Sequence, residues 1–433
     1  MDIHSESNQL VTETNKQSKW WHHRRVKIIG ISITVLVILA ISLILILEVF
    51  IRSTKKPYST TTTTTPPFVW RVTGSMNTPR TKHTAILLKN EKVLVAGGSD
   101  GQSCLFSSEL YDPKTGNWTS TGNMSSNRCE HTMSTLMNGK IFVAGGDTST
   151  AEIYDPSSGI WTATESMMIS RLGHTTSILA DGKILVAGGE TNSAEIYDPL
   201  TGNWTTISSM HSERYQHIAV VLTNGKVLVA GGSKVSYECI MDSCDLYDPS
   251  TKRWTTTGKM NHRRMQHTAL LLTNGKVLVS GGFDDMRKYL KSAELYDPLT
   301  ETWTTTGNMS FPRAGHTASL LRNGKVLVSG GLANSLIRYS TELYDAATRI
   351  WTVANNMNRV RYFHTATELE NGDVLVAGGS EDDNSAELYV SPEKTSATTS
   401  KMNSLVNGPK ASVTEKALNK DGQNNTIGSN KCL

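Results

Sequence analysis

The chain has 433 residues and a formal net charge of +4, which is spread thinly without basic blocks and gives no case for nucleic-acid binding. Its five cysteines are too few and too irregularly spaced for a disulfide scaffold, and Cys239 and Cys244 lack the two further closely spaced ligands that a zinc site would need. Cys239 and Cys244 could close a small loop if the domain lies in an oxidising compartment, and the sequence leaves this open.

The first predicted element is a membrane-spanning helix. Residues 28–47 form an uncharged, almost wholly apolar run that is long enough to cross a hydrocarbon core of ~30 Å. A cleavable signal peptide would have a shorter apolar core, and no small-residue cleavage site follows this run. We therefore assign 1–27 to a cytoplasmic arm and 28–50 to a single signal-anchor helix that contacts the lipid bilayer.

The flanking charges favour one orientation. Five Lys and Arg residues lie shortly before the helix and three lie shortly after it, so the positive-inside bias places the N-terminus in the cytoplasm. Residues 51–67 are rich in Ser, Thr and Pro, which is typical of an O-glycosylated stalk. Glycosylation sequons support the same type II orientation, although the repeat described next generates some of them. They stand at Asn117, Asn123, Asn203, Asn308 and Asn424.

One sequence pattern then recurs seven times, with a period of roughly 43 to 50 residues that is typical of propeller blades. The fullest copy runs from Arg313 and His316 through the pair Gly330-Gly331 to Tyr344 and Trp351. We expect the features that recur to build the fold, and the features that differ between copies to carry function.

Each copy predicts four short strands. In the fullest copy, residues 316–321 and 326–329 are joined by Asn323-Gly324-Lys325, a pair suited to a tight hairpin turn. A third strand covers 341–344, and a fourth begins at the Trp. Such short strands must bury their faces against neighbouring blades. Because the last copy lacks its Trp, we expect residues 70–73 to supply the outer strand of the seventh blade and close the ring.

The repeat resembles the kelch family over about residues 68–390, because it carries a paired glycine followed by a Tyr and a Trp at fixed offsets. It is also similar to the galactose-oxidase type of kelch unit, which has the form Asn-Gly-Lys-Val-Leu-Val-Ala-Gly-Gly. The resemblance implies an all-β, seven-bladed β-propeller at 68–390 that usually binds protein partners. Residues 391–433 are polar and without aromatic side chains, so we interpret them as a disordered tail.

The residues predict no enzyme, cofactor or metal site. The seven repeated histidines lie one per blade, too far apart to converge on one ion, and we interpret them and the preceding arginines as scaffold. The alternative is a diverged copper oxidase, which the family resemblance would equip with copper-binding Tyr and His residues and a Tyr–Cys cross-link. The required Tyr–His pair and the following β domain are not evident, and no phosphate loop, dinucleotide fingerprint or nucleophile motif occurs.

The loops between the second and third strands vary most, and those of blades four to six are long and contiguous. They combine Tyr, Arg and apolar residues, which are enriched at binding hot spots, although they could also be tolerated insertions. We predict a membrane-anchored module, outside the cell or in a lumen, that binds a protein or a glycan through this loop face. The alternative is a cytoplasmic-facing tether for a cytoskeletal or regulatory partner. The predicted binding residues are Tyr237, Phe283, Arg287, Lys288, Tyr289, Arg338 and Tyr339.

Overall fold

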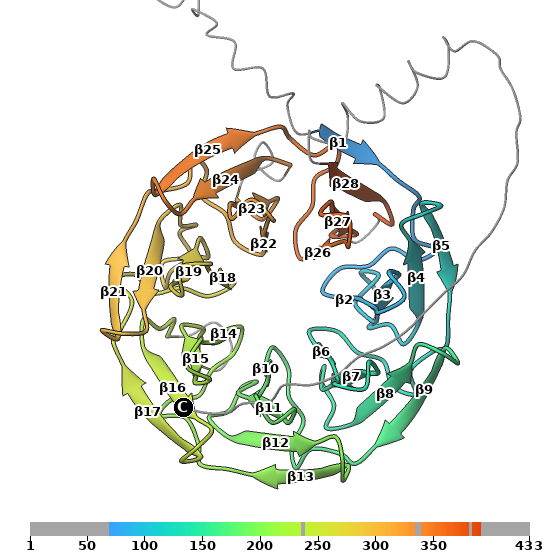
Figure 1. Ribbon diagram of the computed structural model, residues 1–433, viewed down its shortest axis with the longest axis horizontal. Coiled ribbons are helices and arrows are strands. Elements are labelled where there is room, and N and C mark those ends of the chain that lie inside the picture. The colour runs from blue at the N-terminus through green and yellow to red at the C-terminus, as the bar shows by residue number, and fades with distance from the viewer. Residues whose placement is uncertain (1–68, 235–238, 334–338, 381–382, 391–433) are drawn as a thin grey trace, which may run out of the picture. The chain divides into compact units, whose positions relative to one another are not determined.

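A computed structural model describes residues 69–234, 239–333, 339–380 and 383–390 of the chain. They form seven four-stranded antiparallel sheets arranged around a central axis (Figure 1). Within the described residues no helix is both long and apolar enough to span a bilayer, and the predicted membrane helix, stalk and tail lie outside those residues.

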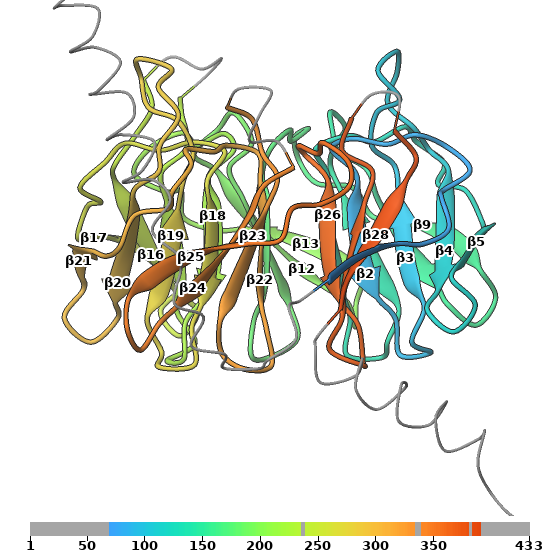
Figure 2. The ribbon, with the colours of Figure 1, turned by 90° about the horizontal axis from the view of Figure 1, so that it is seen from above.

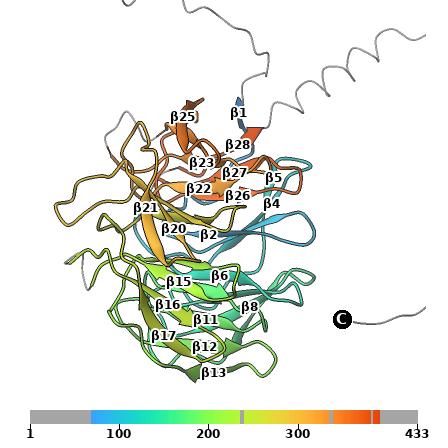
Figure 3. The ribbon, with the colours of Figure 1, turned by 60° about the vertical axis from the view of Figure 1, so that its left-hand side comes forward.

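The first blade contains β2 (Thr84–Leu87), β3 (Val93–Ala96), β4 (Ser108–Asp112) and β5 (Asn117–Ser120). Five further blades repeat this order with shorter or longer loops (Figure 3). Their strands are β6 (Thr132–Thr135), β7 (Ile141–Ala144), β8 (Ala151–Asp155), β9 (Ile160–Thr164); β10 (Thr175–Ile178), β11 (Ile184–Ala187), β12 (Ala194–Asp198), β13 (Asn203–Thr206); β14 (Ile218–Val221), β15 (Val227–Ala230), β16 (Cys244–Asp248), β17 (Arg253–Thr257); β18 (Thr268–Leu271), β19 (Val277–Ser280), β20 (Ala293–Asp297), β21 (Thr302–Thr305); β22 (Thr317–Leu320), β23 (Val326–Ser329), β24 (Thr341–Asp345) and β25 (Ile350–Ala354).

The seventh blade joins the two ends of the repeat region, as predicted. It contains β26 (Thr365–Glu368), β27 (Val374–Ala377), β28 (Ala386–Val390) and, as its outer strand, β1 (Val69–Val72). Trp70 lies directly opposite Tyr389, and its indole N–H donates to the carbonyl of Asn355 in the preceding blade at 2.8 Å. The ring is therefore closed by pairing of residues more than 300 positions apart in the sequence, which leaves β28 without an open edge.

The core lies between the blades rather than within any one of them. In β3, Val93 and Val95 face the seventh blade, while Leu94 and Ala96 face the second. This alternation follows from the two-residue period of a strand, and it explains why the second strand of every blade is fully buried and apolar, apart from the final Ser280 and Ser329 of the fifth and sixth blades. Each blade thus depends on its neighbours for burial.

A buried ion pair repeats in every blade. In the sixth, the Arg313 guanidinium donates to the carbonyls of Gly330 and Ser340 and to the Glu342 carboxylate, at distances of 2.6 to 3.0 Å. A second Glu342 oxygen accepts from the backbone N–H of Ser310 at 2.7 Å. The arginines are almost completely buried, so the prediction that they are scaffold is confirmed. The seven pairs are Arg80–Glu109, Arg128–Glu152, Arg171–Glu195, Arg214–Asp245, Arg264–Glu294, Arg313–Glu342 and Arg361–Glu387.

The repeated histidines are buried too, and they join neighbouring blades. His131 Nε2 lies 2.7 Å from the Thr84 hydroxyl of the blade before it, and five other histidines make the same contact. The fifth blade differs, because Ile218 stands where the others place a threonine and His267 Nε2 has no hydrogen-bond partner among the described residues. Burial, followed by the positive charge of the adjacent arginine, lowers the pKa of His131 to about 3.

Candidate functional site

The two ends of the propeller differ. Tight turns close one face, whereas the longer loops and the blade-to-blade links lie on the other, which is uppermost in Figure 2 and which we call the loop face. Isolated bridges connect each long loop to its neighbouring link, as between Thr81 and Ser99 or Met265 and Phe283. The loop face therefore combines the variable parts of the chain on a rigid frame.

A ring of seven residues surrounds the mouth of the central channel on this face. Each is the residue immediately before a repeated histidine and two positions after a scaffold arginine. Together with the seven histidines, these residues line a cavity of about 310 Å³. All seven have a positive φ, between 49° and 62°. We call them the channel-mouth ring: Lys82, Glu130, Gly173, Gln216, Gln266, Gly315 and Phe363.

The backbone of the channel-mouth ring is a belt of hydrogen bonds between blades. Glu130 N donates to Lys82 O at 3.1 Å, Lys82 N donates to Phe363 O at 2.9 Å, and the same type of bond occurs at four further steps. The belt fixes each backbone position while the side chains vary from Lys to Glu, Gly, Gln and Phe. Aromatic rings cover the two glycines, since an added Cβ would lie 2.5 Å from Tyr215 at Gly173 and 2.7 Å from Phe363 at Gly315.

Glu130 is the hub of the side chains in this ring. One oxygen accepts from Lys82 Nζ at 2.5 Å, and the other accepts from Tyr215 Oη at 2.8 Å and from Gln216 Nε2 at 3.1 Å. Gln266 Nε2 then donates to Gln216 Oε1 at 2.8 Å. The network spans blades one, two, four and five, and the Lys82 ammonium also lies 5.6 Å from the centre of the Phe363 ring. Gln266 also lines a neighbouring cavity.

That second cavity lies over the fifth blade and has a volume of about 340 Å³. Three of the predicted binding residues meet there, with Phe283 and Tyr289 in edge-to-face contact at 6.3 Å between ring centres. We call it the blade-5 cavity, and it is lined by Gln266, Phe283, Arg287, Tyr289 and Leu332. Because Gln266 lines both cavities, the two are neighbours on the loop face.

The blade-5 loop is a compact turn held by an aspartate. Asp284 Oδ1 accepts from the backbone N–H groups of Met286 and Lys288 at 3.0 and 2.9 Å. Asp285 pairs with Arg263 at 2.9 Å. Arg287 is exposed and has no ion-pair partner among the described residues, so its guanidinium is available to a ligand.

The remaining predicted residues have different positions. Lys288 is exposed on the same loop but does not line the cavity. Tyr339 is partly buried and packs against the core between the sixth and seventh blades. Tyr237 and Arg338 lie outside the described residues, as does the Asn424 sequon. The sequons at Asn117, Asn123, Asn203 and Asn308 are all exposed.

The cysteines correct the sequence interpretation. Cys239 is exposed and Cys244 is buried in β16, and both are free, so the structure lacks the bridge suggested by their spacing. The geometric reason is that Cys244 begins a central strand of its blade and faces the neighbouring core. A disulfide joins Cys104 and Cys129 instead, with their Cα atoms 5.3 Å apart. It connects the long loop of the first blade to the link into the second.

Sequence reasoning missed the channel-mouth ring, although a signal was present. The position before each repeated histidine changes in size and charge while the histidine does not, and this is the variation expected of a functional position. Only the fold shows that these positions converge on one mouth.

Comparisons with known proteins agree with the fold. A model of the kelch motif matches residues 80–125, 128–168 and 171–211, and a model of the KLHDC2/KLHL20/DRC7 Kelch-repeats domain matches 216–412. No curated protein matches the chain. Among solved structures, a fungal alcohol oxidase of the AA5 family in complex with copper is similar with a TM-score of 0.64 and 19% identity, covering 75% of this chain and 76% of its own. At that identity the likeness shows the fold alone. The described region is a kelch-repeat β-propeller with seven blades.

Proposed function

We propose that the propeller binds a protein partner through its loop face, with the blade-5 cavity as the principal contact. The observation that carries this proposal is the convergence of Phe283, Arg287 and Tyr289 on one cavity beside the channel mouth. Aromatic and arginine side chains around a pocket are the typical anchors of protein interfaces. Kelch propellers are commonly protein-binding modules, which supports the same conclusion.

The chemistry of the cavity favours an acidic group next to an apolar one. Asp284 is occupied by the turn and Asp285 by Arg263, so neither neutralises Arg287. Phe283, Tyr289 and Leu332 supply apolar walls, and Gln266 supplies an amide at the edge. A carboxylate can form a bidentate contact with a guanidinium while an adjacent apolar side chain packs on the rings. A peptide segment carrying both groups fits this arrangement.

A binding experiment tests the proposal. Peptides displayed from a random library are selected on the full chain, and affinities are then measured for Arg287→Ala and Tyr289→Ala. We expect selection of peptides that carry Asp or Glu beside an apolar residue, and a loss of about tenfold or more in each variant, because a hydrogen bond to a charged group contributes ~1.5–3 kcal/mol.

Arg349→Ala is the matched control, because Arg349 is also exposed and also has a positive φ, 60° against 56° for Arg287, but lies in a turn of the opposite face. It should leave the affinity unchanged. Equal losses in Arg287→Ala and Arg349→Ala would contradict the site. Selection of glycans on an array, with no peptide enriched, would replace the protein partner with a glycan.

We also propose that the propeller is displayed outside a membrane or in a lumen by the apolar segment at 28–50. Two described features support this location. The Cys104–Cys129 disulfide is of a kind that persists in oxidising compartments. Four sequons are exposed, at Asn117 and Asn203 beside the tight turns and at Asn123 and Asn308 after the fourth strands. A cytoplasmic tether is the competing arrangement.

Topology can be measured directly on the full chain with a C-terminal tag. Treatment with an N-glycosidase should increase its gel mobility, and the propeller should resist external protease in sealed microsomes. The control replaces the Asn of all four exposed sequons with Gln, which should abolish most of the shift. A chain that shows no shift and is digested from outside would instead face the cytoplasm.

A copper oxidase is a weaker candidate, because the described residues do not fit that metal. Six of the seven repeated histidines are engaged with a hydroxyl of the neighbouring blade. Within the described ranges no group of three or more His, Cys, Asp and Glu side chains is placed to hold a metal ion. We therefore derive no reaction from the likeness to the alcohol oxidase.

A further inference from the structure

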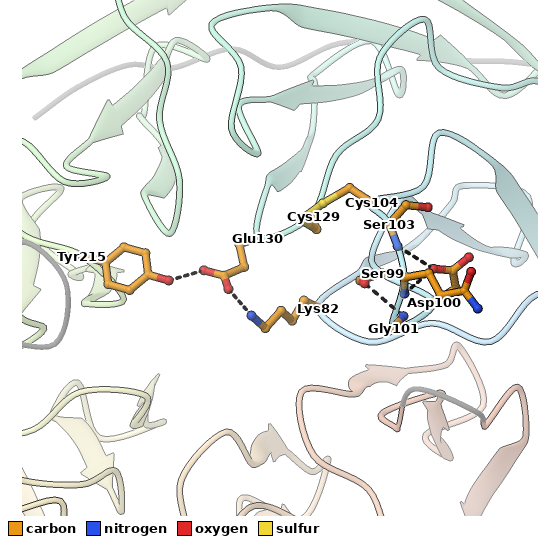
Figure 4. The surroundings of a disulfide bond; sticks show 10 residues. Lys82, Ser99, Asp100, Gly101, Ser103, Cys104, Cys129, Glu130 and Tyr215 are labelled. Atoms are coloured by element: carbon orange, nitrogen blue, oxygen red, sulfur yellow. Dashed lines mark hydrogen bonds and ion pairs between the residues drawn. A yellow bond between two sulfur atoms is a disulfide. The ribbon is translucent and has the colours of Figure 1, made fainter.

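The Cys104–Cys129 disulfide lies immediately beside the hub of the channel mouth. Cys129 precedes Glu130 in the sequence, and Figure 4 shows Lys82 and Tyr215 approaching the Glu130 carboxylate from opposite sides. The carboxylate is only 11% exposed, whereas the Lys82 side chain is 33% exposed. The position of the short segment that carries Glu130 therefore affects how firmly the Lys82 ammonium is held across the mouth.

The equivalent place between blades four and five shows what the bridge replaces. There Ile240 pairs with Ser233 as Cys104 pairs with Ser99, and Met265 follows its scaffold arginine as Cys129 follows Arg128. Ile240 and Met265 are 2% and 0% exposed and pack together in an apolar cluster with Tyr215. At that step, hydrophobic burial attaches the loop to the link.

The first two blades achieve the same attachment by a covalent bond in a polar setting. Both cysteines are only half-buried. The loop around Cys104 is folded by polar contacts, with Asp100 accepting from the N–H groups of Gln102 and Ser103 and Ser99 accepting from Gly101 (Figure 4). The disulfide is thus the principal side-chain tie at this step, and it is accessible to small reagents.

We propose that this disulfide is a redox-sensitive latch, which keeps Glu130 in place and the channel mouth in its braced form only while the bridge is intact. A thiol reductant opens it by two exchange steps. A thiolate attacks one bridge sulfur and releases a cysteine thiolate; a second thiol then displaces the remaining sulfur, so that two cysteine thiols form and two reductant thiols become one disulfide. The Glu130 segment then loses its covalent tie to the blade-1 loop and is held there by backbone hydrogen bonds such as that from Arg128 N to Leu105 O at 2.9 Å, so the Glu130 carboxylate holds Lys82 less firmly across the mouth.

The reactivity of Lys82 reports this change without any need for a ligand. The full chain is treated with an amine-acylating ester before and after reduction with dithiothreitol, and each lysine is quantified by mass spectrometry. We expect reduction to raise the Lys82 acylation rate several-fold, and Cys104→Ser/Cys129→Ser to reproduce the increase. Glu130→Gln weakens the ion pair directly, so its Lys82 acylation rate is the upper reference value for the comparison.

Lys114 is the internal control, because it forms an exposed ion pair with Glu91 at 2.9 Å away from the loop face, and its rate should not change. An unchanged Lys82 rate after reduction, with a raised rate in Glu130→Gln, would show that the bridge is a structural staple only. A Lys82 rate unaffected by Glu130→Gln would overturn the role of the pair itself. A rise at Lys114 together with Lys82 would indicate general unfolding and would also contradict a local latch. This test is independent of the peptide-binding experiment, so the two proposals can fail separately.

Discussion

The propeller is expected to lose much of its stability between pH 7 and pH 5, at an acidity that many globular domains tolerate. The cause is the set of buried repeat histidines. Burial, followed by the charge of the adjacent arginine, lowers the pKa to about 3 for His83, His131, His174, His267 and His364. In the unfolded chain the same groups have a pKa near 6.5.

The direction of the effect follows from proton binding. Between pH 6.5 and 3 the unfolded state binds protons that the folded state excludes, so the stabilising contribution is complete above pH 6.5 and is lost as the pH falls. At pH 5 each histidine reduces the free energy of unfolding by about 2 kcal/mol relative to pH 7. The five histidines together remove about 10 kcal/mol, which is comparable with the whole stability of a typical domain.

Urea unfolding, followed by tryptophan fluorescence at a series of pH values from 7.5 to 5, measures this effect. The free energy of unfolding should fall steeply below pH 6.5. In His174→Gln, which cannot titrate at this position, the slope should decrease by about 1.4 kcal/mol per pH unit, whatever the absolute stability of the variant. A free energy of unfolding that stays constant from pH 7 to 5 would show that the folded state accepts these protons.

Replacing one scaffold arginine should cost more stability than any surface change. In Arg313→Ala the Glu342 carboxylate is left buried without its counterion, and the carbonyls of Gly330 and Ser340 each lose the hydrogen bond from the guanidinium. Removing one partner of a buried pair typically costs about 3–5 kcal/mol. We expect a loss of this size in the free energy of unfolding at pH 7.5, measured by urea denaturation.

Lys114→Ala provides the matched comparison, since it removes an ion pair whose side chains are 74% and 50% exposed. Such a surface pair contributes less than about 1 kcal/mol. A second variant, Arg313→Met/Glu342→Leu, removes both charges together and should recover much of the stability. If Arg313→Ala and Lys114→Ala lost the same small amount, the repeated ion pair would not be a main support of the blades.

Much of the fold could be predicted from the sequence because the same pattern of strands and turns occurs seven times. The Asn-Gly turns, the apolar second strands and the Tyr and Trp positions each fix a strand or its register, as in the opposition of Tyr344 to Trp351. Trp70 indicated the closure, since an outer-strand residue without its own blade has only one free edge to occupy.

The binding site was predicted only in part, because convergence depends on the ring and not on the repeat. Phe283, Arg287 and Tyr289 belong to one loop, so their proximity followed from the sequence. Gln266 and Leu332 join them from separate segments. Glu130 and Tyr215 are 85 positions apart, and nothing in either copy of the repeat indicates that they meet.

The disulfide could not be predicted from the sequence either, because it too joins residues of separate blades. Cys104 and Cys129 are separated by 25 residues, and they meet because Leu105 bridges to Arg128 across two blades. The spacing of Cys239 and Cys244 was the more attractive pattern. Burial of Cys244 in a strand that faces a neighbouring core decided against it, and that burial raises the pKa of its thiol to about 12.

The most direct test of the loop-face proposal is an exchange footprint. A library-selected peptide is bound to the full chain, and amide hydrogen exchange is compared with that of the free protein. We predict protection in residues 263–267 and 283–290, around the blade-5 cavity, with no change in the turns at 298–301 and 346–349 of the opposite face. Protection confined to those turns, with the cavity unaffected, would contradict the proposed binding site.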